Sequence, residues 1–239
     1  IQQYFEMSRF ATVPLSEKRG PLLAAFSSPN DFIGQEAVYQ LVDEPIGVSK
    51  PFYDAAFKSD NIFIRQAIAL SLEEIPTELQ SAFETLLNDV SYVTKEAALY
   101  GLWRNFPEKR AKYLDAMEDV VGFQDKNVRQ LWLALAIVSP NYKLTQKEAF
   151  RNELRGYTSP AYSFEVRQKA FEYINEIQLY NEDVLHNLVN ASVHHNWRFR
   201  EFARTLLSEL FQNPGVKEGV FQNINSFSEE EKNYLLRIK

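Results

Sequence analysis

One short pattern recurs six times along the chain, at intervals of about 33 residues. Each copy opens on a bulky apolar residue and continues as a mostly apolar segment. The copies are "IGQEAVYQL" from Ile33, "IRQAIALSL" from Ile64, "VTKEAALYGL" from Val93, "VRQLWLALAI" from Val128, "VRQKAFEYI" from Val166 and "FREFARTLL" from Phe199. The intervals are 31, 29, 35, 38 and 33 residues. Repeats of this length are typical of arrays in which stacked units share one apolar core.

When the six copies are aligned, each set of equivalent positions forms a column, and these columns follow the pattern of one buried helix face. The anchor residue is always apolar, and the positions four and eight residues after it lie on the same face of a helix. The fourth position is mostly alanine, which lets neighbouring helices approach closely. Its occupants are Ala37, Ile68, Ala97, Trp132, Ala170 and Ala203. Because Trp132 is far larger than alanine, we expect the array to be wider at that copy.

Residues that favour helix starts precede the anchors and also fall between them. An Asp or Asn, which are N-cap types, stands two to four residues before five anchors: Asp31, Asp60, Asp89, Asp125 and Asn196. Capping-box pairs occur at Thr77/Gln80, Thr145/Glu148 and Ser228/Glu231. Pro107 suits the first turn of a further helix. The predicted repeating unit is therefore a helix, a turn and a second helix.

These signals together predict an all-α chain of about six helical pairs. They place the repeats at residues 15–226, after an N-terminal extension at 1–14 and before a capping helix at 227–239, within one continuous domain. The stretch from Leu131 to Val138 is apolar throughout. It belongs to the fourth copy, where units on both sides should cover a helix most fully.

The V-R-x-x-A columns, seen in "IRQAI", "VRQLW" and "VRQKA", resemble those of HEAT-like α-solenoids. The resemblance covers roughly residues 15–226 and implies a right-handed α-α superhelix. The intervals depart from the family, because HEAT repeats usually span about 40–47 residues. The W…L-G…Y pattern of tetratricopeptide repeats and the T-P-L-H pattern of ankyrin repeats are absent, which favours the HEAT-like interpretation.

Composition and charge exclude several classes of protein. The net charge is −6, with 11 Lys+Arg and 18 Asp+Glu in residues 1–120 and 15 and 14 in residues 121–239. Neither half has the basic excess that neutralises phosphates, so nucleic acid is not an expected partner. The longest apolar run is far shorter than the ~20 residues of a membrane span. The chain has no Cys, which excludes disulfides and thiolate sites.

No pattern in the chain carries recognisable catalytic chemistry. The histidines His186, His194 and His195 do not form the i, i+4 pair of a zinc-peptidase helix. The chain has neither a G-x-S-x-G motif nor a phosphate-binding glycine loop, and its paired carboxylates fall on polar helix faces. We therefore predict no catalytic, metal-binding or cofactor-binding residue and interpret the chain as a non-enzyme.

Two sets of residues are candidates for roles beyond core packing. An arginine follows the anchor in four copies: Arg65, Arg129, Arg167 and Arg200. These side chains either bond carboxylates or carbonyls of the preceding unit as a structural ladder, or line the inner face and meet an acidic partner. Their recurrence beside cap-type Asp residues favours the ladder. A candidate interaction surface at helix ends comprises Trp103, His194, His195 and Trp197.

A second resemblance suggests a setting for the chain. The segment "VHHNWRFREFARTLLSEL", with "VRQKAFEYI" before it and "FSEEEKNYLLRI" after it, resembles the C-terminal helical-repeat region of bacterial zinc metallopeptidases of the aminopeptidase N type. The similarity lies mainly in residues 160–239. It implies a non-catalytic domain that docks on the catalytic domain of the same polypeptide and shapes peptide access. Zinc is then expected only in that catalytic domain, whose H-E-x-x-H motif these residues lack. The missing initiator Met indicates a processed product or an excised fragment.

Two other functions stay open. The first is a free-standing HEAT-like adaptor that binds a protein or peptide on the concave face of the solenoid. An upstream H-E-x-x-H motif in the native gene would favour the peptidase setting over this adaptor. The second is an alkyl-base DNA glycosylase built on HEAT-like repeats, which needs a basic face for the duplex. The acidic N-terminal half argues against it.

Overall fold

The computed structural model describes residues 9–123 and 128–238, and every regular element in these ranges is a helix. Contacts between residues divide the chain into two compact units, Ile1–Val120 and Val121–Lys239, called unit 1 and unit 2 below. Within each unit the helices pair with their chain neighbours, and successive pairs pack together. The predicted all-α helical-repeat fold is therefore confirmed. None of the described helices is long and apolar enough to cross a membrane.

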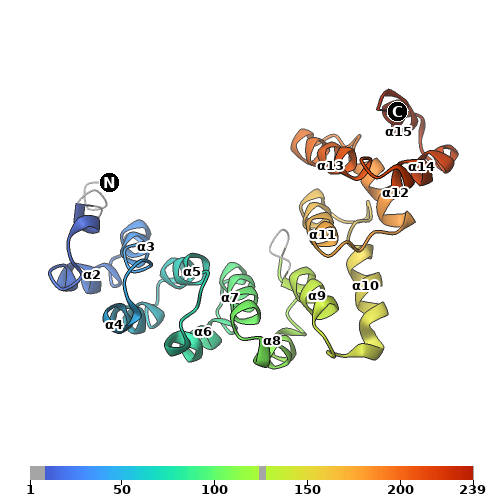
Figure 1. Cartoon of the computed structure of the whole chain (residues 1–239). Coiled ribbons are helices and arrows are strands. Elements are labelled where there is room, and N and C mark those ends of the chain that lie inside the picture. The colour runs from blue at the N-terminus through green and yellow to red at the C-terminus, as the bar shows by residue number, and fades with distance from the viewer. Residues whose placement is uncertain (1–8, 124–127, 239) are drawn as a thin grey trace. The chain divides into compact units, whose positions relative to one another are not determined.

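Unit 1 contains three described helical pairs, with shorter helices before the first (Figure 1). Its elements are η1 (Phe10–Thr12), α2 (Arg19–Ala25), α3 (Asp31–Tyr39), α4 (Ile46–Phe57), α5 (Ile62–Ser71), η2 (Thr77–Leu79), α6 (Gln80–Leu86), α7 (Tyr92–Asn105), η3 (Pro107–Lys109) and α8 (Arg110–Met117). The first helices of the pairs form one row, in which α3 packs on α5 and α5 on α7. The second helices α4, α6 and α8 form the other row.

Unit 2 repeats this arrangement (Figure 1). Its elements are α9 (Val128–Val138), η4 (Leu144–Gln146), α10 (Lys147–Gly156), α11 (Phe164–Glu176), α12 (Glu182–Ala191), α13 (Trp197–Leu210), α14 (Pro214–Gln222), η5 (Ile224–Ser226) and α15 (Glu229–Arg237). The first helices again pack in sequence, α9 on α11 and α11 on α13. Helix α12 packs on α13 and α14. Helix α15 lies within the range predicted for a C-terminal capping helix.

Helix α9 is buried along most of its apolar run, as the sequence predicts. Every residue from Leu131 to Ala136 is buried. Trp132 is 0 % exposed and meets the ring of Phe150 edge-on, with 5.1 Å between ring centroids. The guanidinium of Arg129 lies 4.5 Å from the centroid of the Trp132 ring. A large indole thus occupies the column that most copies give to alanine, and the rings of Phe150 and Tyr142 pack edge-on against it.

The third copy of the repeat lies one residue later than the sequence pattern suggested. The predicted anchor Val93 is only half-buried, whereas Thr94 and Ala98 are both 0 % exposed. Helices α3, α5, α11 and α13 each begin two residues before their anchor. Helix α7 begins at Tyr92 and follows the same rule only if Thr94 is the anchor. The prediction was wrong because it required an apolar anchor, while the core here contains a threonine.

The N-caps of the first helices differ in part from the predicted ones. Asn30 and Asn61, rather than the neighbouring Asp31 and Asp60, accept the backbone N–H two residues ahead in α3 and α5. Ser91, rather than Asp89, caps α7. A cap must directly precede the first helical residue, so the Asn or Ser at that position takes the role from an Asp one or two residues away. Asn196 caps α13 as predicted, and Asp125 lies outside the described residues.

Of the three predicted capping boxes, one forms. Ser228 and Glu231 bond each other's backbone N–H at the start of α15. At Thr77 and at Thr145 the chain instead enters the helix through the 3-10 turns η2 and η4, and no side-chain cap forms there. A 3-10 turn bonds three residues back rather than four, so the spacing of the box no longer fits. Pro107 opens η3 at the position predicted for it.

Candidate functional site

The first helices of unit 1 expose a large apolar side chain at the same position. Counting from the first residue of α3, α5 and α7, the ninth residue is Tyr39, Leu70 and Tyr100. These side chains are 50 %, 57 % and 42 % exposed. Because α3 packs on α5 and α5 on α7, the three residues form a row across the stack.

A second row runs parallel to the first, two turns earlier in each helix. The second residue of these helices is Phe32, Phe63 or Val93. Phe32 is 68 % and Phe63 39 % exposed, and Val93 is half-buried. Residues seven apart lie on one helix face, so the two rows share a surface. The fifth residue of each helix lies between the rows and is polar: Gln35, Gln66 and Glu96. We call these three rows the first-helix face.

Acidic residues border the first-helix face where α3 and α5 end. The turn after α3 carries Asp43 and Glu44, and the turn after α5 carries Glu73 and Glu74. Asp43, Glu73 and Glu74 are exposed. None of these four carboxylates forms an ion pair within the part of the chain that the structure describes. With 11 Lys+Arg against 18 Asp+Glu in residues 1–120, unit 1 is acidic overall, and these carboxylates add to its negative potential.

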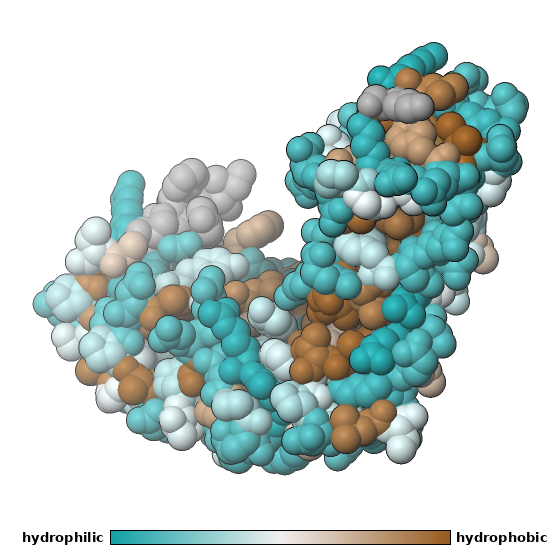
Figure 2. Space-filling view, turned by 45° about the vertical axis from the view of Figure 1, so that its right-hand side comes forward, coloured by the Kyte–Doolittle hydropathy of each residue, from teal (hydrophilic) through white to brown (hydrophobic). Residues whose placement is uncertain are grey.

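Exposed apolar side chains are common on protein surfaces when they stand singly, but ordered groups of them mark interaction sites. In the space-filling view, apolar side chains interrupt the hydrophilic surface in several places (Figure 2). What distinguishes the first-helix face is that its apolar residues recur at equal helix positions on neighbouring helices. Folding buries a different face of the same helices, so it does not require apolar residues here. The recurrence therefore points to a contact outside the fold.

Among the arginines of the predicted ladder, Arg65 on α5 bonds loops at both ends of its helical pair. It donates to the Ser59 carbonyl before α5, at 2.6 Å, and to the Asp89 carboxylate after α6, at 2.5 Å from Nε to Oδ2. The Asp89 side chain is 2 % exposed, so this ion pair lies largely out of water. In unit 2, Arg129 on α9 forms a bidentate pair with Glu153 on α10, at 2.8 and 2.7 Å.

The other two arginines bond mainly to backbone carbonyls. Arg167 is buried and donates to the Thr158 carbonyl at 2.9 Å and to the Asn187 carbonyl at 3.1 Å. Burial lowers the pKa of Arg167 to about 10, which still leaves it charged at neutral pH. Arg200 donates to the His194 carbonyl at 3.1 Å. Since all four guanidinium groups are engaged with protein atoms of their own unit, we do not include them in the candidate surface.

The four residues of the predicted interaction surface belong to different units. Trp103 lies on α7 in unit 1 and is half-buried beneath Arg110, whose guanidinium is 3.9 Å from its ring centroid. The other three lie at the start of α13 in unit 2. There Trp197 is 62 % exposed, and the rings of His194 and His195 are 4.1 Å apart. Only Trp197 and His195 are largely open to solvent, so this part of the predicted surface is small.

His194 has the environment of a neutral imidazole. Its Nδ1 accepts the Asn196 backbone N–H at 3.1 Å. Burial lowers the pKa of His194, and the positive charges of His195 and Arg167 lower it further. In residues 9–123 and 128–238, no group of three or more His, Asp or Glu side chains is arranged to hold a metal ion. The described arrangement at His194 is that of a helix-start contact rather than a ligand set.

Neither a comparison with protein-family models nor one with curated proteins finds a significant match to this chain. The resemblance to the aminopeptidase N type therefore stays a prediction that rests on the quoted sequence segments.

The first-helix face is not evident from the predicted repeat, although the sequence carries a signal for it. Tyr39, Leu70 and Tyr100 each stand six residues after the anchors Ile33, Ile64 and Thr94. With Val93 taken as the third anchor, Tyr100 moves out of this column and the row disappears. The start of α7, which makes Thr94 the third anchor, places Tyr100 in the same column as Tyr39 and Leu70.

Proposed function

We propose that this chain is a non-catalytic helical-repeat domain that binds another protein surface through the first-helix face. The observation that carries the proposal is the exposed row of Tyr39, Leu70 and Tyr100 on three neighbouring helices. Aromatic residues are enriched among the side chains that dominate binding energies, because they bury a large area at little cost in conformational entropy. A second row adds the exposed rings of Phe32 and Phe63 to this surface.

The spacing of the helices indicates what such a partner presents. Packed helices lie about 8–10 Å apart, so neighbouring side chains of one row are separated by about that distance. A polyproline II segment turns once in three residues and rises about 3.1 Å per residue, so every third side chain recurs on one face after roughly 9 Å. A partner segment with apolar residues at that period matches the row. Basic residues between them would meet the carboxylates that border the face.

The partner that we propose is the catalytic domain of a zinc aminopeptidase-like protein, within the same polypeptide. The support for it is the resemblance of residues 160–239 to the helical-repeat region of the aminopeptidase N type. In this setting the domain docks on the catalytic domain and shapes the access of peptides to it. A free-standing adaptor is the alternative, and it would use the same face for a separate protein or peptide.

Binding to the face is testable with a labelled peptide of repeated Leu-Pro-Lys triplets, followed by fluorescence anisotropy. We expect saturable binding that weakens as salt is added, because charges on both sides contribute. A Leu-Pro-Glu peptide tests the charge requirement and should bind far more weakly. The triple variant Tyr39→Ser, Leu70→Ser, Tyr100→Ser should reduce affinity by at least about tenfold, since each truncated anchor costs on the order of 1 kcal/mol or more.

A matched control variant carries Leu144→Ser and Leu236→Ser, which remove side chains that are 63 % and 57 % exposed in unit 2. This control should bind the Leu-Pro-Lys peptide like the unaltered chain. Equal affinity of the triple variant and the unaltered chain would refute the face as the binding surface. Equal affinity for the Lys and Glu peptides would refute the basic character of the partner.

The peptidase setting has a separate test. Purified alone, the chain is expected to bind no stoichiometric zinc and to cleave no aminoacyl-anilide substrate. An open reading frame with H-E-x-x-H upstream of these residues would support the setting, and its product can then be tested for docking. Robust peptidase activity of the isolated chain would contradict the proposal.

A further inference from the structure

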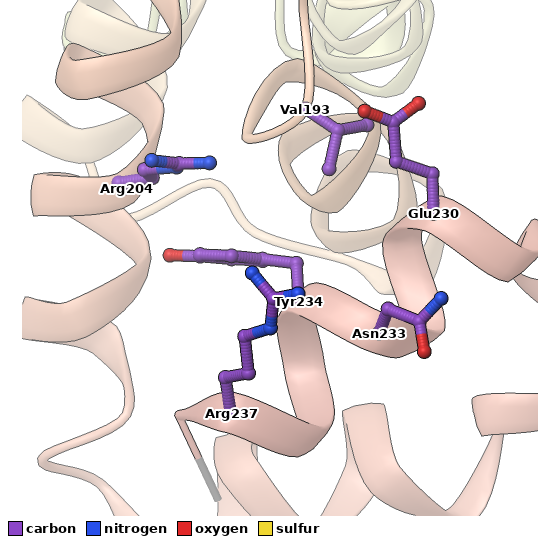
Figure 3. A pocket seen from close by; sticks show the side chains of 6 residues that line it. All are labelled: Val193, Arg204, Glu230, Asn233, Tyr234 and Arg237. Atoms are coloured by element: carbon purple, nitrogen blue, oxygen red, sulfur yellow. The ribbon is translucent and has the colours of Figure 1, made fainter.

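Unit 2 contains a hollow of about 380 Å³ that no step of the proposed function uses. It is lined by Val193, Arg204, Glu230, Asn233, Tyr234 and Arg237. These residues come from the loop after α12, from α13 and from α15 (Figure 3). Small-molecule sites usually measure about 300–1,000 Å³, so the hollow is large enough for a small organic ligand. We call it the α13–α15 hollow.

One guanidinium of the hollow is held in a fixed position. Arg204 donates from Nε to the carbonyl of the buried residue Ser192 at 2.9 Å, and from Nη1 to Glu201 at 3.3 Å. Its guanidinium also lies 4.8 Å from the ring centroid of Tyr234. Figure 3 shows this group reaching from α13 toward Tyr234. A guanidinium that is already oriented loses little further freedom when it bonds a ligand.

Two other groups of the hollow, the Arg237 guanidinium and the Tyr234 hydroxyl, form no hydrogen bonds with the described residues. Arg237 forms no hydrogen bond or ion pair with any described residue, and its guanidinium points toward Tyr234 from the end of α15. The Tyr234 hydroxyl also bonds no described residue. Burial raises the pKa of Tyr234, the nearby Arg204 lowers it and Glu201 raises it, with a net rise. The phenol therefore stays protonated at neutral pH and is able to donate a hydrogen bond.

We propose that the α13–α15 hollow binds a small organic monocarboxylate with an apolar body. The carboxylate accepts hydrogen bonds from the guanidinium groups of Arg204 and Arg237 and from the Tyr234 hydroxyl. Guanidinium groups suit a planar carboxylate because they offer parallel N–H donors. The apolar body lies against Val193 and the ring of Tyr234.

The negative charge of Glu230 bears on whether the bound anion is a carboxylate or a phosphate. It also lines the hollow, and it forms no ion pair within the described residues. With the guanidinium groups of Arg204 and Arg237, the charged residues that line the hollow sum to about +1, which a monocarboxylate balances and a phosphate dianion exceeds. We therefore infer a carboxylate rather than a phosphate. The proposal concerns residues 193–237 and is independent of the first-helix face in unit 1.

The test is a titration of the isotope-labelled chain with phenylacetate, followed by amide chemical shifts in α13 and α15. Phenylacetamide, which has the same apolar body without the charge, and inorganic phosphate serve as comparison probes. We expect saturable shifts with phenylacetate and much weaker ones with the other two. Arg237→Gln should weaken phenylacetate binding by about tenfold, the scale of one lost charge-assisted hydrogen bond. Tyr234→Phe should weaken it less.

Arg198→Gln is the matched control, because Arg198 lies on α13, is exposed and does not line the hollow. This control removes the same charge and should leave phenylacetate binding unchanged. Equal binding of phenylacetate and phenylacetamide would overturn the proposal. Tighter binding of phosphate would also overturn it, as would an Arg237→Gln variant that binds phenylacetate like the unaltered chain.

Discussion

Units 1 and 2 use equivalent helix positions in opposite ways. At the ninth residue of the first helices, unit 1 exposes Tyr39, Leu70 and Tyr100, while α11 and α13 of unit 2 carry Glu172 and Thr205. At the second residue, Phe32 and Phe63 in unit 1 correspond to Glu165 and Arg198 in unit 2. The buried columns are alike in both units, with Ala37 and Ala203 at the same position. The comparison shows that the helices of both units bury similar columns, although the exposed positions are apolar in unit 1 and polar in α11 and α13 of unit 2.

The interiors of the two units also differ in the size of one buried residue on a first helix. Unit 1 brings helices close together, with Gly34 of α3 beside Ile64 of α5. Unit 2 instead buries the large ring of Trp132 on α9. Each unit therefore has a buried position on a first helix where a change in residue size should be felt.

The largest effect is expected for Trp132→Ala. The ring is 0 % exposed and packs edge-on against Phe150, so its removal leaves a cavity that rigid helices cannot close. We expect a loss of about 3–5 kcal/mol in the free energy of unfolding. Hydrogen exchange of α9, α10 and α11 measures it without mixing in unit 1. A loss below about 1 kcal/mol, less than a typical Ile→Val truncation, would show that unit 2 collapses freely around the site.

The next effect is expected for Gly34→Ala in unit 1. An added Cβ would lie 2.5 Å from Cδ1 and 2.6 Å from Cγ1 of Ile64, which is fully buried. Overpacking of this kind costs about 1–3 kcal/mol, and urea unfolding would measure it. Gly47→Ala on α4 is the control, because its Cβ meets nothing within 4 Å. That variant should be neutral or slightly stabilising, and equal losses in both variants would contradict the close-approach argument.

A smaller effect is expected for Glu231→Gln at the end of unit 2. Burial raises the pKa of Glu231, but bonds from the Ser228 backbone and from Asn190 lower it more, giving a net fall. A depressed folded pKa stabilises the protein above the ordinary glutamate pKa, and this contribution disappears as pH falls through the folded value. We expect a loss of about 1 kcal/mol at neutral pH, the size of a lost cap.

This loss should shrink in acid, and thermal unfolding between neutral and acidic pH would follow it. Glu229→Gln is the matched control in the same first turn, since the Glu229 side chain is 86 % exposed. A constant difference between Glu231→Gln and the unaltered chain across this range would contradict the assigned ionisation.

A weaker pH dependence of folding stability is expected from His194. It should occur at mildly acidic pH, above the more acidic range in which Glu231 acts. The folded pKa of His194 is lowered by burial and by the charges of His195 and Arg167. The folded state therefore binds fewer protons, so stability is complete above the ordinary histidine pKa and falls as pH drops toward the folded value. In His194→Asn this loss should disappear, and in His195→Asn it should shrink. Unfolding midpoints at mildly acidic and neutral pH measure it, and an unchanged slope in His194→Asn would refute the assignment.

The smallest effect on stability is expected for the first-helix face itself. Exposed substitutions usually change stability by no more than about 0.5 kcal/mol each. Tyr39→Ser, Leu70→Ser and Tyr100→Ser should therefore leave the unfolding midpoint nearly unchanged while together they weaken peptide binding by at least about tenfold. A large loss of stability would mean that these side chains support the fold, and the contrast between the units would lose its functional meaning.

Much of the architecture was predictable because its causes are local. Apolar residues at helical spacing, with Ala37, Ala170 and Ala203 in one column, specify helices that must bury one face against neighbours. The apolar run through Trp132 required cover from neighbouring helices, and its residues from Leu131 to Ala136 are buried. The capping box at Ser228 formed where its spacing suggested. Each of these inferences uses residues within a few turns of one another.

What the sequence by itself determined is the all-α repeat, its helical pairs and its buried columns. Only the tertiary structure decided that Asn30 rather than Asp31 caps α3, and that Arg65 pairs with Asp89 across 24 residues of chain. It also decided that Thr94 rather than Val93 is the third anchor, which placed Tyr100 beside Tyr39 and Leu70. The physical reason is that periodicity shows which side chains share a helix face. Whether that face meets a neighbour or the solvent depends on how the helices pack.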